Sequence, residues 1–282
     1  MKRRRWKKSK EATPVGEARR SQLLTTYGAG SMIDLVDRSI LVAGLDFWNY
    51  PGERPVILEP RLSARLVMRF RQAKRLLNPV NTFSPPPACD DREPSEHAGL
   101  QVVEFPRWMV CQACRQLVQA SSSLKIVEGR YRHACGGKQD VLVPVRFVIM
   151  CGNGHLEEFP WSSFVHDGGT CTSAALTMTE DAGAELFDVR VTCLACNASR
   201  TMEQAEPFVK ASPCRGSRPW LGRASDVPEP CEVEVTMKVR TSSSTYFGVS
   251  QSAISIPNAA DRLEGLVKKH LPMLNEADLD DL

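Results

Sequence analysis

The sequence predicts an α+β protein in which short strands and loops are organised by cysteine-rich turns, with few helices. Four of its ten cysteines form two Cys-x2-Cys pairs. The chain of 282 residues also contains 19 prolines and 18 glycines, spread along its length. Frequent Pro and Gly favour short elements over long helices. With 42% hydrophobic and 24% charged residues, the composition is that of a globular chain long enough to bury a sizeable core.

The first 18 residues form a basic arm that we expect to be disordered. Residues 1–20 contain nine Lys or Arg and two Glu, a net charge of +7, so the remainder carries −4 of the total of +3. A clustered basic arm is typical of nucleic-acid contact, although a tail that only aids solubility has the same composition. The candidate phosphate-contacting residues of the arm are Lys2, Arg3, Arg4, Arg5, Lys7 and Lys8.

Residues 19–98 are predicted to form an N-terminal α/β region. It contains a glycine turn at residues 28–30, a short strand at residues 40–43, and a helix over residues 62–77 with apolar side chains at three- and four-residue spacing. A Pro-rich linker follows over residues 78–98. Cations lie mostly off the apolar stripe of the helix, where they form either a solvated face or a phosphate-contacting face. They are Arg65, Arg69, Arg71, Lys74 and Arg75.

Residues 99–257 are predicted to form a β-rich domain that holds the cysteine-rich turns. Strands are expected at residues 141–150, 186–191 and 233–239, because their residues are apolar or alternate between apolar and polar. Residues 258–282 are expected to form a terminal helix, over residues 259–274, and an acidic tail.

The compartment expected from the sequence is the cytoplasm. The basic start is not followed by an apolar segment of the kind found in signal peptides, and no run of about 18 apolar residues predicts a membrane span. Cysteines in a reducing compartment are more often metal ligands than disulfides.

Two Cys-x2-Cys pairs are the strongest chemical signals. Two thiolates on one tight turn bind one tetrahedral Zn²⁺, and each pair needs two further ligands. For Cys111 and Cys114, the candidates are His133 and Cys135, with Cys151 as a competitor. The sequence thus predicts a zinc ribbon over residues 111–135.

The second pair and the remaining Cys and His residues supply the other candidate sites. For Cys193 and Cys196, the ligands that follow in order are Cys214 and Cys231. A third knuckle would then combine Cys151, His155, His166 and Cys171, unless the two histidines are hydrogen-bonded structural residues. We therefore expect two or three structural Zn²⁺ ions, with Cys89 free.

Four protein ligands close a zinc site, whereas a catalytic zinc keeps one position open. We therefore expect no catalytic residue. The alternative is a zinc-dependent enzyme acting on nucleic acid. A deaminase-like site would use His155 and Glu157 with Cys193 and Cys196, although Thr192 replaces the expected proline. A nuclease-like site could use Glu157 with Glu158.

Trp108, Trp161 and Trp220 are interpreted as packing around the metal sites rather than stacking on bases.

Between Arg19 and Pro257, a series of short sequence motifs follows one another in the same order as in a known family. They are Ser21–Gly28, Phe105–Trp108 before Cys111, Val143–Phe147, Cys151–Leu156, Phe159–Trp161, Val165–His166, Cys193–Cys196, Cys214–Gly216, Pro219–Gly222, Cys231, Ser252–Ile254 and Ile256–Pro257. Together they resemble the DrmB family of the bacterial DISARM anti-phage system. Ala29 stands where the family pattern has proline.

This resemblance implies a non-catalytic partner of an ATP-driven helicase. It implies association with a DrmA-like helicase subunit and with the DNA backbone, in the bacterial cytoplasm and without a membrane. The Cys and His residues named above match the family's pattern of metal ligands. Family members are longer, so the chain is expected to be a short variant or one half of a split protein whose other half is a second protein.

Overall fold

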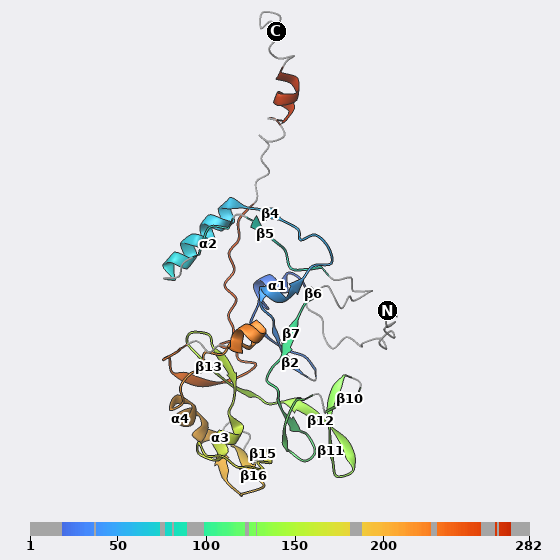
Figure 1. Cartoon of the computed structure of the whole chain (residues 1–282), viewed down its shortest axis with the longest axis vertical. Coiled ribbons are helices and arrows are strands. Elements are labelled where there is room, and N and C mark those ends of the chain that lie inside the picture. The colour runs from blue at the N-terminus through green and yellow to red at the C-terminus, as the bar shows by residue number, and fades with distance from the viewer. Residues whose placement is uncertain are drawn as a thin grey trace, which may run out of the picture. The chain divides into compact units, whose positions relative to one another are not determined.

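A computed structural model describes residues 19–36, 38–73, 77–80, 82–88, 99–121, 124–127, 129–180, 188–226, 230–254, 263 and 265–271. They form two compact units, coloured along the chain in Figure 1. Unit 1 comprises the described residues up to Arg54 and those from Pro86 to Ser250, and unit 2 comprises those in Pro55–Pro85 and from Gln251 onward. The predicted region 19–98 thus contributes residues to both units.

Unit 1 consists mainly of short strands, which confirms the predicted fold class. Its elements are α1 (Gln22–Thr25), β1 (Met32–Asp34), β2 (Ser39–Val42), η1 (Leu45–Phe47), β3 (Trp48–Asn49), β6 (Gly99–Leu100), β7 (Val102–Glu104), β8 (Trp108–Cys111), β9 (Leu117–Gln119), β10 (Lys125–Val127), β11 (Arg130–Cys135), β12 (Lys138–Pro144), β13 (Phe147–Cys151), β14 (Leu156–Glu158), α3 (Trp161–Val165), β15 (Leu176–Glu180), β16 (Val189–Cys193), β17 (Ser199–Thr201), η2 (Met202–Gln204), α4 (Ala205–Lys210), η3 (Pro219–Asp226) and β18 (Val235–Val239).

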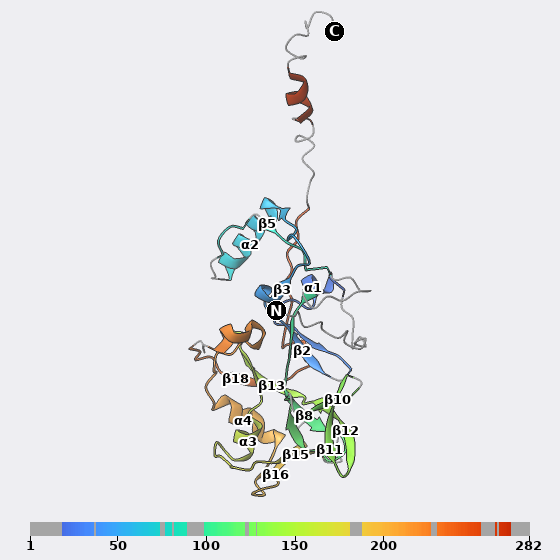
Figure 2. The ribbon, with the colours of Figure 1, turned by 45° about the vertical axis from the view of Figure 1, so that its right-hand side comes forward.

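The strands of unit 1 pair antiparallel in several small sheets. Their orders are β1-β2-β7, β10-β11-β12-β8-β9, β14-β13-β18, β15-β16-β17 and β3-β6. In both Figure 1 and Figure 2, β10–β12 lie on one side of this unit and α3 and α4 on the other. The largest core cluster lies between these sides, around the fully buried Trp161, Phe147 and Phe164. A smaller core, around Met109 and Leu142, lies under the five-stranded sheet.

The prediction of one strand over residues 141–150 is wrong, because the segment divides between two sheets. β12 ends at Pro144 and pairs with β8 and β11, whereas β13 begins at Phe147 and pairs with β14 and β18. Proline has no N–H to donate to a ladder, so it favours the end of a strand. The predicted strands at residues 40–43 and 233–239 are present as β2 and β18, and residues 189–193 form β16.

Unit 2 contains β4 (Ile57–Leu58), α2 (Pro60–Gln72) and β5 (Thr82–Phe83). The helix predicted over residues 62–77 begins at Pro60, whose fixed φ suits the first helical turn, and it ends before Leu77, which is not helical. Leu62, Leu66 and Phe70 of its apolar stripe are half-buried. In the predicted terminal helix, Leu263 and residues 265–271 are helical and exposed.

None of the described helices is both long enough and apolar enough to cross a membrane.

Candidate metal centres

Twelve Cys and His side chains gather into three groups of four in unit 1. Within each group, one potential ligand atom per residue lies within 4.8 Å of the others. The groups are cluster A, with Cys111, Cys114, His133 and Cys135; cluster B, with Cys151, His155, Cys214 and Cys231; and cluster C, with His166, Cys171, Cys193 and Cys196. All nine described cysteines are free thiols, and Cys89 lies outside the described residues.

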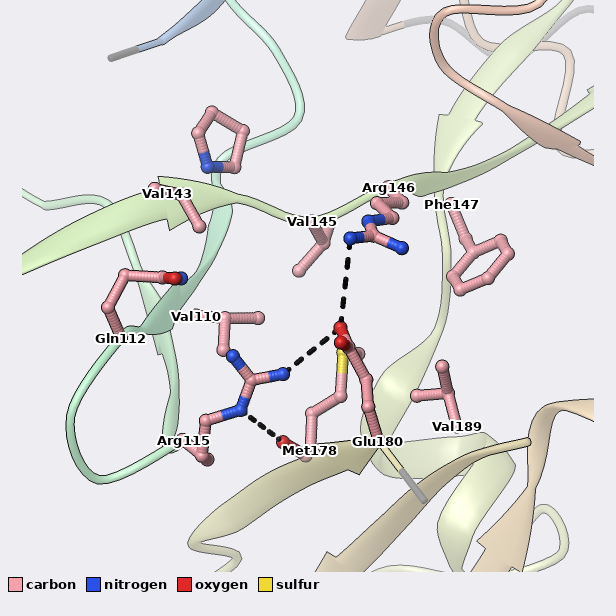
Figure 3. A pocket seen from close by; sticks show the side chains of 11 residues that line it. Val110, Gln112, Arg115, Val143, Val145, Arg146, Phe147, Met178, Glu180 and Val189 are labelled. Carbon is pink, nitrogen blue, oxygen red and sulfur yellow. Dashed lines mark hydrogen bonds and ion pairs between the residues drawn. The ribbon is translucent and has the colours of Figure 1, made fainter. Parts of the chain in front are cut away.

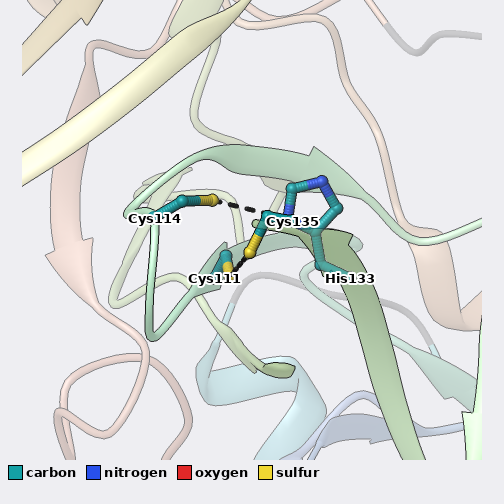
Figure 4. A group of neighbouring side chains, drawn as sticks. All are labelled: Cys111, Cys114, His133 and Cys135. Carbon is teal, nitrogen blue, oxygen red and sulfur yellow. Dashed lines mark hydrogen bonds between the residues drawn. The ribbon is translucent and has the colours of Figure 1, made fainter. Parts of the chain in front are cut away.

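Cluster A is built by two segments of the five-stranded sheet, the turn after β8 and the strand β11, which flank β12 (Figure 4). Cys111 ends β8, and Cys114 lies on the turn that leads to β9. His133 and Cys135 are two residues apart on β11, so their side chains share one face of the sheet. The Sγ atoms of Cys111 and Cys135 are 3.7 Å apart, and Cys114 Sγ lies 3.5 Å from His133 Nδ1. The four ligand atoms point toward one another, and Cys151, the competing candidate, belongs to cluster B.

Cluster C uses the same kind of turn as cluster A. Cys193 ends β16 as Cys111 ends β8, and each turn contains a second cysteine followed by a residue with φ of 61°, Asn197 or Arg115. This left-handed conformation is uncommon outside glycine and tightens the turn. The N–H groups of the two residues donate to the carbonyls of Cys193 and Cys111, at 2.8 and 3.0 Å. The two knuckles are therefore local structures specified by the Cys-x2-Cys spacing.

His166 of cluster C is oriented by the end of α3. Its Nδ1–H donates to the Ser162 carbonyl at 2.7 Å, and its Nε2 is buried without a hydrogen-bond partner among the described residues. The bond at Nδ1 fixes the tautomer that leaves a lone pair on Nε2, which is the arrangement found around metal-binding histidines. A metal ion in cluster C would satisfy this orphaned nitrogen.

Cluster B joins segments that lie far apart in the sequence. Cys151 ends β13, and a turn containing Gly154 with φ of 80° brings His155 back to it. His155 is buried, and its Nδ1 lies 3.4 Å from the Sγ atoms of both Cys151 and Cys214. Cys151 Sγ lies 3.8 Å from Cys231 Sγ. The amide of Asn153 donates to Cys231 Sγ at 3.5 Å, so this side chain supports the cluster from outside.

One thiol in each cluster is set up to ionise first. Burial opposes ionisation of Cys193, but the N–H groups of Cys196 and Ala195 are the main causes that outweigh it and lower its pKa to about 6. In cluster A, burial likewise opposes ionisation of Cys111. Its pKa is nevertheless lowered to about 7 by the N–H groups of Cys114 and Ala113 and by the His133 ring. Hydrogen bonds to a thiolate favour the charged form.

In cluster B, the N–H of Val233 is the main cause that lowers the pKa of Cys231 to about 7. Two other thiols, Cys135 and Cys214, resist a second negative charge. Burial and then Cys111 raise the pKa of Cys135 to about 12, and burial and Cys151 contribute to raising that of Cys214 to about 12. A bound cation reverses this resistance, because it deprotonates coordinating thiols.

The structure corrects the predicted grouping of two ligand sets. Cys193 and Cys196 meet His166 and Cys171, not Cys214 and Cys231, which close on Cys151 and His155. Cluster C is thus nested inside the chain segment that cluster B closes. The deaminase-like combination of His155 with Cys193 and Cys196 is not assembled, because these residues lie in different clusters. The prediction grouped ligands by their order along the chain. It was wrong because β15–β17 form a sheet of their own, and the Cys-x2-Cys turn of that sheet belongs to cluster C.

A family model described as "Domain of unknown function (DUF8724)" matches residues 19–247, which contain all three clusters. The chain belongs to this family. It is also similar to the DISARM protein DrmB of Bacillus paralicheniformis, with 26% identity over 177 residues. That match covers 59% of this chain but 30% of the relative, so this family member spans about a third of the length of the DrmB protein it matches.

The predicted nucleic-acid residues fall in two places. Arg65, Arg69 and Arg71 are exposed on α2. Arg65 also donates to the Ser252 carbonyl within unit 2. The other predicted contacts lie outside the described residues. They are Lys2, Arg3, Arg4, Arg5, Lys7, Lys8, Lys74 and Arg75. Among the tryptophans, Trp161 is buried in the core as predicted, and Trp108 and Trp220 are half-buried.

Sequence reasoning did not find Arg200, which braces the loop of cluster C. Its Nη1 donates to the Phe164 carbonyl at 3.2 Å and to Asp167 Oδ1 at 2.7 Å, on both sides of His166. Its guanidinium lies 5.0 Å from the ring centroid of Phe164 and 5.4 Å from that of Phe208. Nothing in the local sequence marks this role, because Phe164 and Asp167 lie more than 30 positions earlier in the chain than Arg200.

We expect Arg200→Gln to loosen metal binding in cluster C without removing a ligand. Outer residues that orient ligands typically change metal affinity roughly 10–100-fold, so release to a chromogenic chelator should be faster by about tenfold for that cluster alone. Arg190→Gln, at an exposed position on β16, is the matched control and should leave the release curve unchanged. Equal release from Arg200→Gln and the original protein would contradict a bracing role.

Proposed function

We propose that the chain is a non-catalytic zinc-binding protein that joins a DNA helicase or translocase and contacts the DNA backbone in anti-phage defence. The observation that carries this proposal is the closed donor set of all three clusters. Each supplies four protein ligands from Cys and His. Four such ligands complete a tetrahedral structural site and leave no position for a substrate or a reactive water.

Zinc is the ion that the donor chemistry favours. Clusters of three thiolates with one imidazole are typical of structural zinc sites. Bond lengths of about 2.3 Å to sulfur and about 2.0 Å to nitrogen place tetrahedral S···S pairs about 3.8 Å apart and S···N pairs about 3.6 Å apart. The S···S separations of 3.7 and 3.8 Å and the S···N separations of 3.4 and 3.5 Å support this assignment.

Similarity to DrmB supports a place in a DISARM system. We propose that the chain associates there with a DrmA-like helicase subunit in the bacterial cytoplasm. Co-expression with such a helicase should give a complex that survives affinity purification in moderate salt. Recovery of the two proteins in separate fractions at all salt concentrations would contradict the association.

The DNA part of the proposal is tested on α2, where exposed arginines face solvent. Replacing Arg65, Arg69 and Lys74 together by Gln should weaken binding to duplex DNA and lower the slope of log affinity against log salt by about three, because each lost phosphate contact lowers it by about 0.9. The charge-preserving variant with R65K, R69K and K74R should bind like the original. Unchanged affinity of the neutral variant in low salt, with unchanged folding by circular dichroism, would remove α2 from the DNA interface.

A further inference from the structure

A row of polar and cationic side chains crosses one face of the five-stranded sheet of unit 1. The strand register places Lys125 of β10 opposite Arg132 of β11, and Arg132 opposite Val141 of β12. Gln112 continues the row, since its N–H donates to the Val141 carbonyl at 3.1 Å. Alternation along β11 places His133 on the opposite face, with cluster A. The row therefore faces away from the metal ligands.

The charge of this row is not neutralised within the described part of the chain. Two cations directly opposite each other destabilise a strand pair, and neither Lys125 nor Arg132 forms an ion pair with a described residue. The Nε of Arg132 is also buried without a hydrogen-bond partner among these residues. Such an arrangement favours an anionic partner at this face.

The row ends at a small pocket between the five-stranded sheet and β15–β16 (Figure 3). Its volume is about 150 Å³, and Gln112 belongs both to the row and to the pocket wall. A cavity of this size accommodates a six-membered ring. The apolar part of its lining is formed by Val110, Val143, Val145, Phe147, Met178 and Val189.

Two arginines and one glutamate form the polar rim of the pocket. Arg115 is held firmly, by Glu180 at 3.1 Å and by the Met178 carbonyl, to which its Nε donates at 3.1 Å. Arg146 is held loosely, because its Nη2 lies 3.9 Å from Glu180 and 59% of its side chain is exposed. An exposed ion pair of this length contributes little. Arg146 is thus available to an incoming anion.

We propose that the row and the pocket bind a single-stranded nucleic acid, with phosphates on Lys125, Arg132 and Arg146 and one base in the pocket. Proteins that bind single strands combine a cationic surface along the backbone with apolar sites for bases. The row spans three strand spacings, about 14 Å, which is enough for several phosphates to lie along it. A base in a duplex would have to leave its stack to enter the pocket. This inference rests on the proposed nucleic-acid function but assigns it to unit 1 instead of α2.

The first test measures binding of a fluorescent oligothymidylate to the full chain. Replacing Lys125, Arg132 and Arg146 together by Gln should weaken binding by roughly tenfold in low salt and lower the salt slope by about two, at about 0.7 per lost phosphate contact. The variant with K125R, R132K and R146K keeps the charge and should bind like the original. Glu180→Gln should strengthen binding, because it removes the anion that competes with phosphate for Arg146.

The second test concerns the pocket and the class of ligand. An abasic oligomer with the same number of phosphates has no base to enter the pocket. It should therefore bind the original protein roughly tenfold more weakly than oligothymidylate does. Equal binding of the two oligomers, or equal binding of polyglutamate, would overturn the inference. If only the α2 variant weakens DNA binding, this inference fails and the proposed function stands; if the original chain binds no nucleic acid, both fail.

Discussion

Replacing Cys231 by Ser is expected to remove the zinc ion of cluster B and to lower the stability of unit 1 severely. Cys231 completes cluster B, which joins the end of β13 to segments that follow α4. A structural zinc contributes an apparent 10–16 kcal/mol in small zinc-binding modules, about the whole stability of a typical domain at 5–15 kcal/mol. Because cluster B closes the segment that contains cluster C, its loss frees both ends of that segment.

The measurement is zinc per chain by atomic emission together with thermal melting by circular dichroism. The original protein should hold three zinc ions, and Cys231→Ser should lose at least one with a large fall in melting temperature. Cys196→Ser should lose one ion with a smaller fall, since cluster C is nested and Cys196 lies exposed on its knuckle. Cys89→Ser is the control at the cysteine predicted to be free. Three ions and an unchanged melting curve for Cys231→Ser would contradict the assignment of cluster B.

Trp161→Ala is expected to lower the free energy of unfolding by about 3–5 kcal/mol, as other large truncations in cores do. The side chain is 1% exposed and lies at the centre of the main core. Its ring centroid is 4.5 Å from that of Phe159 and 6.4 Å from that of Phe147. The cavity left by the indole would border several other buried side chains, and urea unfolding measures the loss.

Trp161→Phe separates packing from the polar part of the indole. The Nε1–H of Trp161 is buried and has no hydrogen-bond partner among the described residues, so Phe removes an unsatisfied donor while filling most of the volume. We expect a change below about 1.5 kcal/mol. Both variants should keep the zinc content of the original. A cost for Trp161→Ala below that of Trp161→Phe would contradict the central packing role.

Features of the chain were predictable where the residues that form them lie close together in the sequence. Cys111, Cys114, His133 and Cys135 lie close together along the chain, and their spacing identified them as candidates for one site, with Cys151 as a competitor that the structure places in cluster B. The amphipathic pattern likewise predicted α2, although not its end, since periodicity does not show where the helical hydrogen bonds stop. Trp161 was correctly interpreted as a core residue.

Features that depend on sheet formation were not predictable in this way. The apolar run at residues 141–150 gives no sign that it leaves one sheet at Pro144 and enters another at Phe147. Arg200, Asn153 and the pocket beside Arg115 bring together residues from separate strands, and no sequence signal marks them.

The sequence by itself determined that the chain is an α+β protein with twelve candidate metal ligands, because ligand type and Cys-x2-Cys spacing are local chemistry. The tertiary structure alone decided which ligands share a cluster. Cys193 could meet either His166 or Cys214 by order along the chain, and the pairing of β15, β16 and β17 into their own sheet brings it to His166. The physical reason is that a metal site selects ligands by distance in space, which strand pairing sets and sequence separation does not.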